Sequence, residues 1–137
     1  MTEYNNKTIF LPQQIYDKIR EAAERELPDE ACGYLAGQDD TITDIIPMTN
    51  CDHSPEHFSF DPHEQFAAAR AARKNGQELI AVYHSHPASP AKMSDEDIKL
   101  AADKNIIYII YSVSENRLGA FKIGDQSVIM EINIIIR

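Results

Sequence analysis

Apolar side chains recur at helical spacing in residues 11–27, and two further segments, the Ala-rich residues 62–75 and the shorter residues 94–104, also favour helices. In the first segment charged residues occupy the positions between the apolar ones, as expected for a helix that buries one side. This pattern stops before Pro28, and the second stops at Asn75-Gly76, which are common signals for a helix end. We therefore predict three helices, of which the third is the shortest.

The other apolar runs are short or alternate with polar residues, which predicts strands. These runs are residues 32–37, 41–48, 58–60, 78–83, 106–113, 118–123 and 128–136. The polar stretch at 49–56 predicts a loop, and we expect the residues before Leu11 to form a short tail. Because helices interleave with strands and the last three strands follow one another like hairpins, we predict an α/β fold with a mixed sheet flanked by helices, in a single domain spanning residues 1–137.

Length and charge narrow the class of protein. The 137 residues suffice for one domain with a core, and 43% hydrophobic with 26% charged residues is ordinary for a globular protein. A formal net charge of −9 makes nucleic acid or an anionic membrane a poor partner, since binding to phosphates depends on Lys and Arg. No apolar run approaches the ~20 residues of a membrane helix, and the N-terminus lacks the features of a signal peptide. We therefore expect a cytoplasmic protein.

The stretch His84-Ser85-His86-Pro87 carries the candidate chemistry. It follows an apolar run that predicts a buried strand, and side chains of a strand alternate between its faces. His84 and His86 must therefore point the same way. Because a carboxylate arrives from the next element at Asp97, we predict a site with three metal ligands and one open position, as in catalytic zinc sites.

Each part of this pattern also has a structural interpretation. Ser94 followed three residues later by Asp97 is a helix capping box, and histidines near strand ends are often only hydrogen-bonded. Metal-assisted hydrolysis further needs a carboxylate base close to the metal. Glu30 lies at the entrance of a buried strand, where position alone favours a surface residue over a catalytic one. The two motifs together, at this spacing, favour the metal site.

The chain resembles the JAMM (MPN+) zinc metalloprotease family, and in particular its short prokaryotic members. The resemblance lies in residues 27–37, which include Glu30, in the His-Ser-His-Pro stretch and in Ser94-Asp95-Glu96-Asp97. It implies a cytidine-deaminase-like α/β/α sandwich with a curved mixed β-sheet, the JAB/MPN fold.

The same resemblance implies roles for five residues. His84, His86 and Asp97 would bind one zinc ion per chain, Glu30 would be the general acid/base, and Ser94 would donate a hydrogen bond to the developing oxyanion. The family cleaves peptide or isopeptide bonds after the tails of ubiquitin-like proteins, and its short members are linked to sulfur carriers that end in Gly-Gly. We expect such a tail to bind along an exposed strand edge.

Several alternatives stay open at this point. The domain could be a non-catalytic module that recognises ubiquitin-like proteins or scaffolds a complex, whereas the signature of a nucleoside deaminase is missing. Histidines 53, 57 and 63 could form a second metal site, and the basic residues 70, 73 and 74 could contact an acidic carrier. Cys32 and Cys51 could be linked by redox chemistry, and the apolar segment 132–136 could pair across a homodimer.

Overall fold

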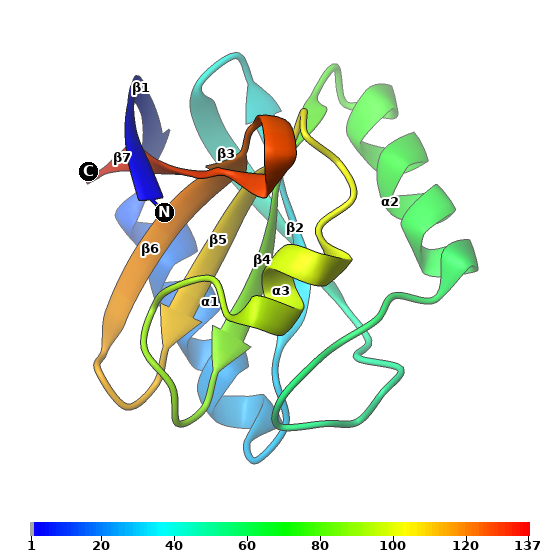
Figure 1. The fold of residues 1–137 in the computed structure, drawn as a ribbon. Coiled ribbons are helices and arrows are strands. Elements are labelled where there is room, and N and C mark those ends of the chain that lie inside the picture. The colour runs from blue at the N-terminus through cyan, green and yellow to red at the C-terminus, as the bar shows by residue number, and fades with distance from the viewer. Residues whose placement is uncertain (1) are drawn as a thin grey trace.

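The computed structural model describes residues 2–137, with side chains from Lys7 onward (Figure 1). Its strands are β1 Thr2–Leu11, β2 Cys32–Gln38, β3 Thr41–Met48, β4 Glu78–His86, β5 Ile107–Ser112, β6 Arg117–Ile123 and β7 Ile129–Ile136. Its helices are α1 Gln13–Glu26, α2 Pro62–Lys74 and α3 Asp95–Leu100, and a short 3-10 turn covers Asp125–Ser127.

The seven strands form one mixed sheet in the order β1-β3-β2-β4-β5-β6-β7. β4 pairs with β5 in parallel and with β2 in antiparallel orientation, so it is flanked on both edges. The sheet curls until β1, which runs parallel to β7, also meets β3 at the single pair Phe10–Thr41. The predicted mixed sheet flanked by helices is confirmed, with α1 on one face and α2 and α3 on the other (Figure 1).

Two apolar clusters lie on opposite faces of this sheet, and β4 contributes to both. Ala81 and Tyr83 join the cluster that contains the buried side of α1. Val82 joins the second cluster, which includes Ala68 of α2 and Tyr108 of β5. Because side chains alternate along a strand, the next even position, His84, continues on the face that α2 and α3 cover.

Three sequence predictions on elements were wrong. The residues before Leu11 form β1 rather than a tail, because they pair with the C-terminal strand β7, which no local pattern shows. Residues 58–60 form no strand, since Phe58 and Phe60 instead pack against each other and against the second cluster. The third helix ends at Leu100 instead of 104.

The longer helices follow their local signals. α1 begins after Pro12, and α2 begins with Asp61, whose carboxylate accepts a hydrogen bond from the backbone of His63. α2 ends at Asn75, before Gly76 with a positive φ of 70°. Within residues 2–137 no helix has the length and apolar content needed to cross a membrane.

Replacing Gly33 by alanine should destabilise the contact between β2 and β4. An added Cβ would stand 2.5 Å from the ring of Tyr83 and 2.5 Å from the carbonyl oxygen of Ile46. We expect Gly33→Ala to lower the free energy of unfolding by about 1–3 kcal/mol, measured by urea denaturation. The control is Gly124→Ala, where the nearest atom lies at 3.4 Å. Equal effects of the two substitutions would contradict the close approach at Gly33.

Candidate metal centre

Two imidazoles lie at the C-terminal end of β4. His84 and His86 are buried, with 1% and 3% of their surface exposed. Their ring centroids are 5.0 Å apart and their Nε2 atoms 3.2 Å apart, so they share one face as the alternation of the strand predicts. The intervening Ser85 points to the other face.

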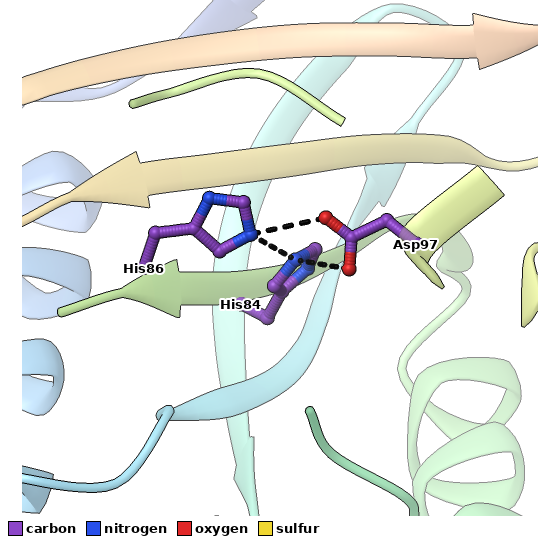
Figure 2. A group of neighbouring side chains, drawn as sticks. All are labelled: His84, His86 and Asp97. Atoms are coloured by element: carbon purple, nitrogen blue, oxygen red, sulfur yellow. Dashed lines mark hydrogen bonds and ion pairs between the residues drawn. The ribbon is translucent and has the colours of Figure 1, made fainter. Parts of the chain in front are cut away.

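Asp97, in the first turn of α3, brings a carboxylate to the two imidazoles (Figure 2). Its Oδ1 lies 3.2 Å from Nε2 of His84, and its Oδ2 lies 3.0 Å from Nε2 of His86. The three ligand atoms all lie within 4.8 Å of one another, and they are the one such group found among the described residues. Two imidazole nitrogens and a carboxylate oxygen can hold a divalent metal ion.

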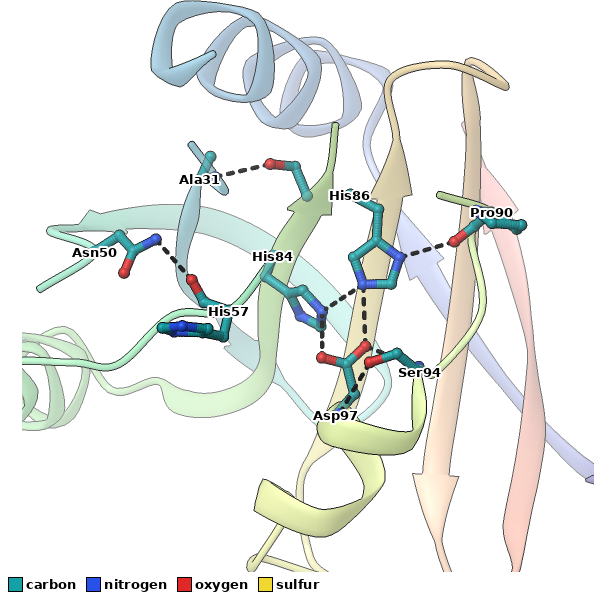
Figure 3. Close-up of polar contacts among 9 residues, drawn as sticks. Ala31, Asn50, His57, His84, His86, Pro90, Ser94 and Asp97 are labelled. Atoms are coloured by element: carbon teal, nitrogen blue, oxygen red, sulfur yellow. Dashed lines mark hydrogen bonds and ion pairs between the residues drawn. The ribbon is translucent and has the colours of Figure 1, made fainter. Parts of the chain in front are cut away.

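The hydrogen bond of His86 fits this use. Its Nδ1 donates to the carbonyl oxygen of Pro90 at 2.8 Å, which leaves the lone pair of Nε2 directed at Asp97 and His84 (Figure 3). A lone pair, a second ring nitrogen and a carboxylate repel one another unless positive charge lies between them. Metal-bound histidines typically donate their other nitrogen to a carbonyl in this way. The donor set therefore fits a cation.

The charges of the group agree with this geometry. Burial would raise the pKa of Asp97, but hydrogen bonds with His84, His86 and the backbone of Ser94 outweigh it and hold the pKa well below its usual range. Burial lowers the pKa of His84 and so favours the neutral ring, which is the form that binds metals. Burial opposes protonation of His86, but in the doubly protonated ring Nε2 would donate to Asp97 while Nδ1 donates to Pro90, and these bonds raise its pKa. A metal ion would take the place of the proton on Nε2. The carboxylate is thus ionised and the centre attracts positive charge.

The capping box predicted at Ser94 and Asp97 is present, and the same two residues hold a carboxylate beside the histidines. Ser94 Oγ accepts a hydrogen bond from the backbone nitrogen of Asp97, and the backbone nitrogen of Ser94 donates to Asp97 Oδ2, each at 3.0 Å (Figure 3). These bonds fix the start of α3 and hold the carboxylate toward the histidines. Ser94 is exposed, and its hydroxyl proton is not used by the cap.

Glu30 lies buried beside this centre instead of on the surface, where position in the sequence alone would put it. It is 2% exposed, and its Oε1 has no hydrogen-bond partner within the described chain. Burial raises its pKa from 4.5 to about 8, while the charge of His86 lowers it and that of Asp97 raises it. The register of β2 on β4 pairs Cys32 with His84, and its continuation by two residues brings Glu30 beside His86.

Two side chains anchor the backbone that carries Glu30, and Figure 3 shows their bonds to Ala31 and to His57. Ser85 Oγ accepts from the backbone nitrogen of Ala31 at 2.8 Å, and Ser85 donates its own backbone N–H to the oxygen of Ala31 at 3.0 Å. The amide of Asn50 donates to the backbone oxygens of Glu30 and His57, both at 3.1 Å. Asn50 escaped the sequence analysis because its partners are backbone atoms of separate segments, which leave no local signal.

The loop between β3 and α2 closes over the imidazoles. Phe58 stacks on the ring of His84, with centroids 4.8 Å apart and planes at 31°. His57, next to it, bonds through Nδ1 to Asp52 Oδ2 at 2.7 Å. Aromatic packing thus fixes a segment whose sequence predicts only a loop and a short strand.

The other candidate groups do not come together. Among the described residues no second set of three metal ligands exists, so the histidines at 53, 57 and 63 form no such site. Cys32 is buried, Cys51 is exposed, and neither forms a disulfide. Ile132 lies in the core while Ile135 and Ile136 are exposed, and the homodimer stays a prediction.

Comparisons with known proteins agree with one another. The sequence profile described as prokaryotic homologs of the JAB domain (Prok-JAB) matches residues 12–124. The chain is 36% identical over 119 residues to the CysO-cysteine peptidase of Mycobacterium tuberculosis, with 82% of each chain covered. It is 33% identical over 124 residues to the probable TtuB-protein conjugate cleaving protease of Thermus thermophilus, covering 90% of this chain and 82% of that one. It is 34% identical over 116 residues to the desampylase of Haloferax volcanii, covering 82% and 83%.

Solved structures share the fold. The solution structure of a protein from Desulfitobacterium hafniense superimposes with a TM-score of 0.87 at 38% identity, over 94% of this chain and 92% of that one. A JAB1/MPN domain protein from Archaeoglobus fulgidus gives a TM-score of 0.60 at 21% identity, over 94% and 98%. The fold expected from the sequence, a curved mixed sheet with helices, is therefore confirmed.

We expect the purified protein to bind about one divalent metal ion per chain through Asp97, because three ligand atoms converge there. Asp97→Asn should lose the metal, since an amide can still cap α3 but carries no charge. The matched control is Asp95→Asn, an exposed residue of the same first turn, which should keep the metal. Metal content is measured by elemental mass spectrometry after zinc loading and dialysis. Full occupancy in Asp97→Asn would mean that Asp97 only caps the helix.

The raised pKa of Glu30 predicts how stability depends on pH. Between 4.5 and about 8 the folded state keeps a proton that the unfolded state has released, so this group makes the protein less stable as pH rises through that window. Glu30→Gln has no such proton. Without metal, the difference in free energy of unfolding between Glu30→Gln and the wild type should therefore shift in favour of the variant as pH rises above 5. The shift is at most roughly 1.4 kcal/mol per pH unit. Urea denaturation with chelator at pH 5, 6.5 and 8 measures this, and a constant difference would contradict burial of an ionisable Glu30.

Proposed function

The chain belongs to the family of prokaryotic JAB-domain homologues, and we propose that it is a zinc-dependent peptidase that cleaves after the Gly-Gly tail of a ubiquitin-like or sulfur-carrier protein. The observation that carries the proposal is the convergence of His84, His86 and Asp97 beside the buried Glu30. The relatives named above include a CysO-cysteine peptidase and a TtuB-conjugate protease, which support this class of substrate. A single catalytic domain and a cytoplasmic location are part of the proposal.

The three ligand residues would hold zinc through His84 Nε2, His86 Nε2 and the carboxylate of Asp97. Zinc bound there would lower the pKa of a water molecule and polarise the scissile carbonyl group. Three protein ligands leave a position open for these roles. The bond from His86 Nδ1 to Pro90 keeps the ring in the orientation that binding requires.

Glu30 would act as the general acid/base. Its Oε1 has no partner within the described chain, so it is free to accept a proton from the attacking water and to pass it to the leaving amine. Without metal, burial raises its pKa to about 8, and the positive charge of zinc bound nearby would lower it again, which favours the carboxylate that accepts the proton. Ser85 and Asn50 hold the backbone of this segment, so the carboxylate stays aimed at the centre.

Ser94 would stabilise the negative charge that develops on the carbonyl oxygen. Its Oγ accepts from the backbone of Asp97, which leaves its proton available for donation, and the side chain is exposed beside the ligand Asp97. Such a donor typically contributes about 2.7–4 kcal/mol to the stability of a transition state.

The carrier tail would bind along the outer edge of β3. This strand pairs with β2 along its length, whereas its other edge meets β1 only at Phe10–Thr41. Residues 43–48 therefore offer backbone groups to which an extended tail can add as a strand. The last residue of β3, Met48, pairs with Cys32 at the start of β2. Cys32 follows Glu30 by two residues, so a tail bound along β3 would lead toward the centre.

Substituting Glu30 should separate cleavage from binding. We expect Glu30→Gln to reduce hydrolysis of Gly-Gly carrier fusions by about 10²–10⁴-fold, because the proton acceptor is lost, while zinc content stays near one per chain. Fusions of several small carriers, each extended by a reporter tail, are followed by mass spectrometry of the products. Glu56→Gln, which changes an exposed glutamate of the neighbouring loop, is the control and should cleave like the wild type.

The alternative of a non-catalytic binding module predicts a different result. In that case the zinc-loaded wild type would bind carriers without cutting any of them, and Glu30→Gln would change nothing. The intact set of ligands beside a buried carboxylate favours the peptidase.

A further inference from the structure

An apolar pocket of about 130 Å³ adjoins the metal ligands on the side of α3. The imidazole of His84 and the carboxylate of Asp97 form part of its wall, together with His57 of the loop between β3 and α2. The rest of the lining is apolar or aromatic, contributed by Phe58, Met93, Leu100, Ala101 and Tyr108. The mechanism proposed above makes no use of these five side chains.

The walls of this pocket are held in place by contacts of their own. Phe58 stacks on His84 and packs against Phe60, at centroid distances of 4.8 and 5.3 Å. The hydroxyl of Tyr108 donates to the backbone oxygen of Asp103 at 2.9 Å and accepts from its nitrogen at 3.2 Å. These bonds tie the segment after α3 to β5. Contacts within the chain therefore fix the Phe58 and Tyr108 walls, and a preformed wall is usual at binding sites for small groups.

Size and lining define what the pocket can take. A cavity of ~150 Å³ lined by apolar side chains holds one benzene molecule. The pocket beside His84 is slightly smaller, so it matches one aliphatic or thioether side chain of medium size. An acidic group would lose its hydration against a lining that is mostly apolar and contains no Lys or Arg, so its burial there is unfavourable.

The position of the pocket identifies which substrate residue it binds. On the carrier side the tail ends in two glycines, which have no side chain to place in a pocket. A side-chain pocket that borders His84 and Asp97 lies within one residue's reach of the scissile bond, so we assign it to the first residue on the other side of that bond. We propose that this pocket binds an apolar side chain of the residue that leaves, and that it selects substrates in which Gly-Gly is followed by such a residue.

This inference rests on the proposed function for the identity of the bond that is cut. Hydrolysis adds water across the amide, so the carrier is released with a carboxylate and the leaving residue with a free amine. The pocket holds the side chain of the leaving residue throughout. Burial of its methylene groups then favours apolar residues, since each methylene in such a pocket changes kcat/KM by about 10-fold or more.

Selectivity is tested with one carrier that ends in Gly-Gly and is extended by a residue X and a short polar tail. Residue X is glycine, alanine, leucine, methionine or aspartate. The wild type should cleave the leucine and methionine forms at least 10-fold faster in kcat/KM than the glycine form, and the aspartate form slowest. Ala101→Leu fills the pocket and should remove most of this preference. Ala102→Leu makes the same change at the next, exposed residue outside the pocket and should preserve the preference.

A binding measurement separates the pocket from the reaction. Zinc-loaded Glu30→Gln is titrated with N-acetyl-Gly-Gly-Leu-amide and N-acetyl-Gly-Gly-Gly-amide while NMR signals of Phe58, Met93 and Tyr108 are recorded. The leucine peptide should shift these signals, the glycine peptide should not, and adding Ala101→Leu should abolish the shift.

Three outcomes are distinguishable. Cleavage without preference for X, or equal effects of Ala101→Leu and Ala102→Leu, would contradict the proposed role of the pocket. Neither result would contradict the proposed peptidase activity. Absence of cleavage with every carrier would contradict the proposed function. The NMR titration would then be the test of whether the pocket binds an apolar side chain. Leucine-specific shifts would uphold an apolar side-chain site beside the metal ligands, and their absence would overturn it.

Discussion

The pairing of β2 with β4 is the constraint on which the site depends. Glu30 precedes β2 by two residues, and the histidines end β4, so the antiparallel register Cys32–His84 brings Glu30 beside His86. Residues directly opposite in such a pair point to the same face, and the reciprocal bonds between Ser85 and Ala31 lock the alignment. A slip by one residue would turn each imidazole to the opposite face.

The start of α3 serves structure and chemistry with the same two residues. Asp97 Oδ2 accepts from the backbone of Ser94 and lies 3.0 Å from His86 Nε2, so the bond that caps the helix also aims the carboxylate at the histidines. The cap matters because α3 has only six residues and buries none of them. Its position depends on the cap, on the contact with the histidines and on Ile98, which packs against the second cluster. We infer that metal binding and helix formation support each other.

The sequence predicted the ligand face but not the surroundings of the site. Local alternation was enough to place His84 and His86 together, because the period of a strand is a property of the backbone. The burial of Glu30 could not be derived in that way, since it depends on Asn50 and on the loop that packs Phe58 over His84. The resemblance to JAMM proteases supplied what local patterns lacked, namely which of the 22 acidic residues matters.

The sequence by itself determined the elements whose signals are local: α1, α2, the strands from β2 to β7, and the motifs that carry ligand chemistry. The tertiary structure alone decided that the residues before Leu11 form β1, because that strand exists through pairing with β7 at the far end of the chain. It also decided the pocket beside His84, whose walls come from four separate segments. Periodicity is encoded in neighbouring residues, whereas burial and pairing arise only when distant segments meet.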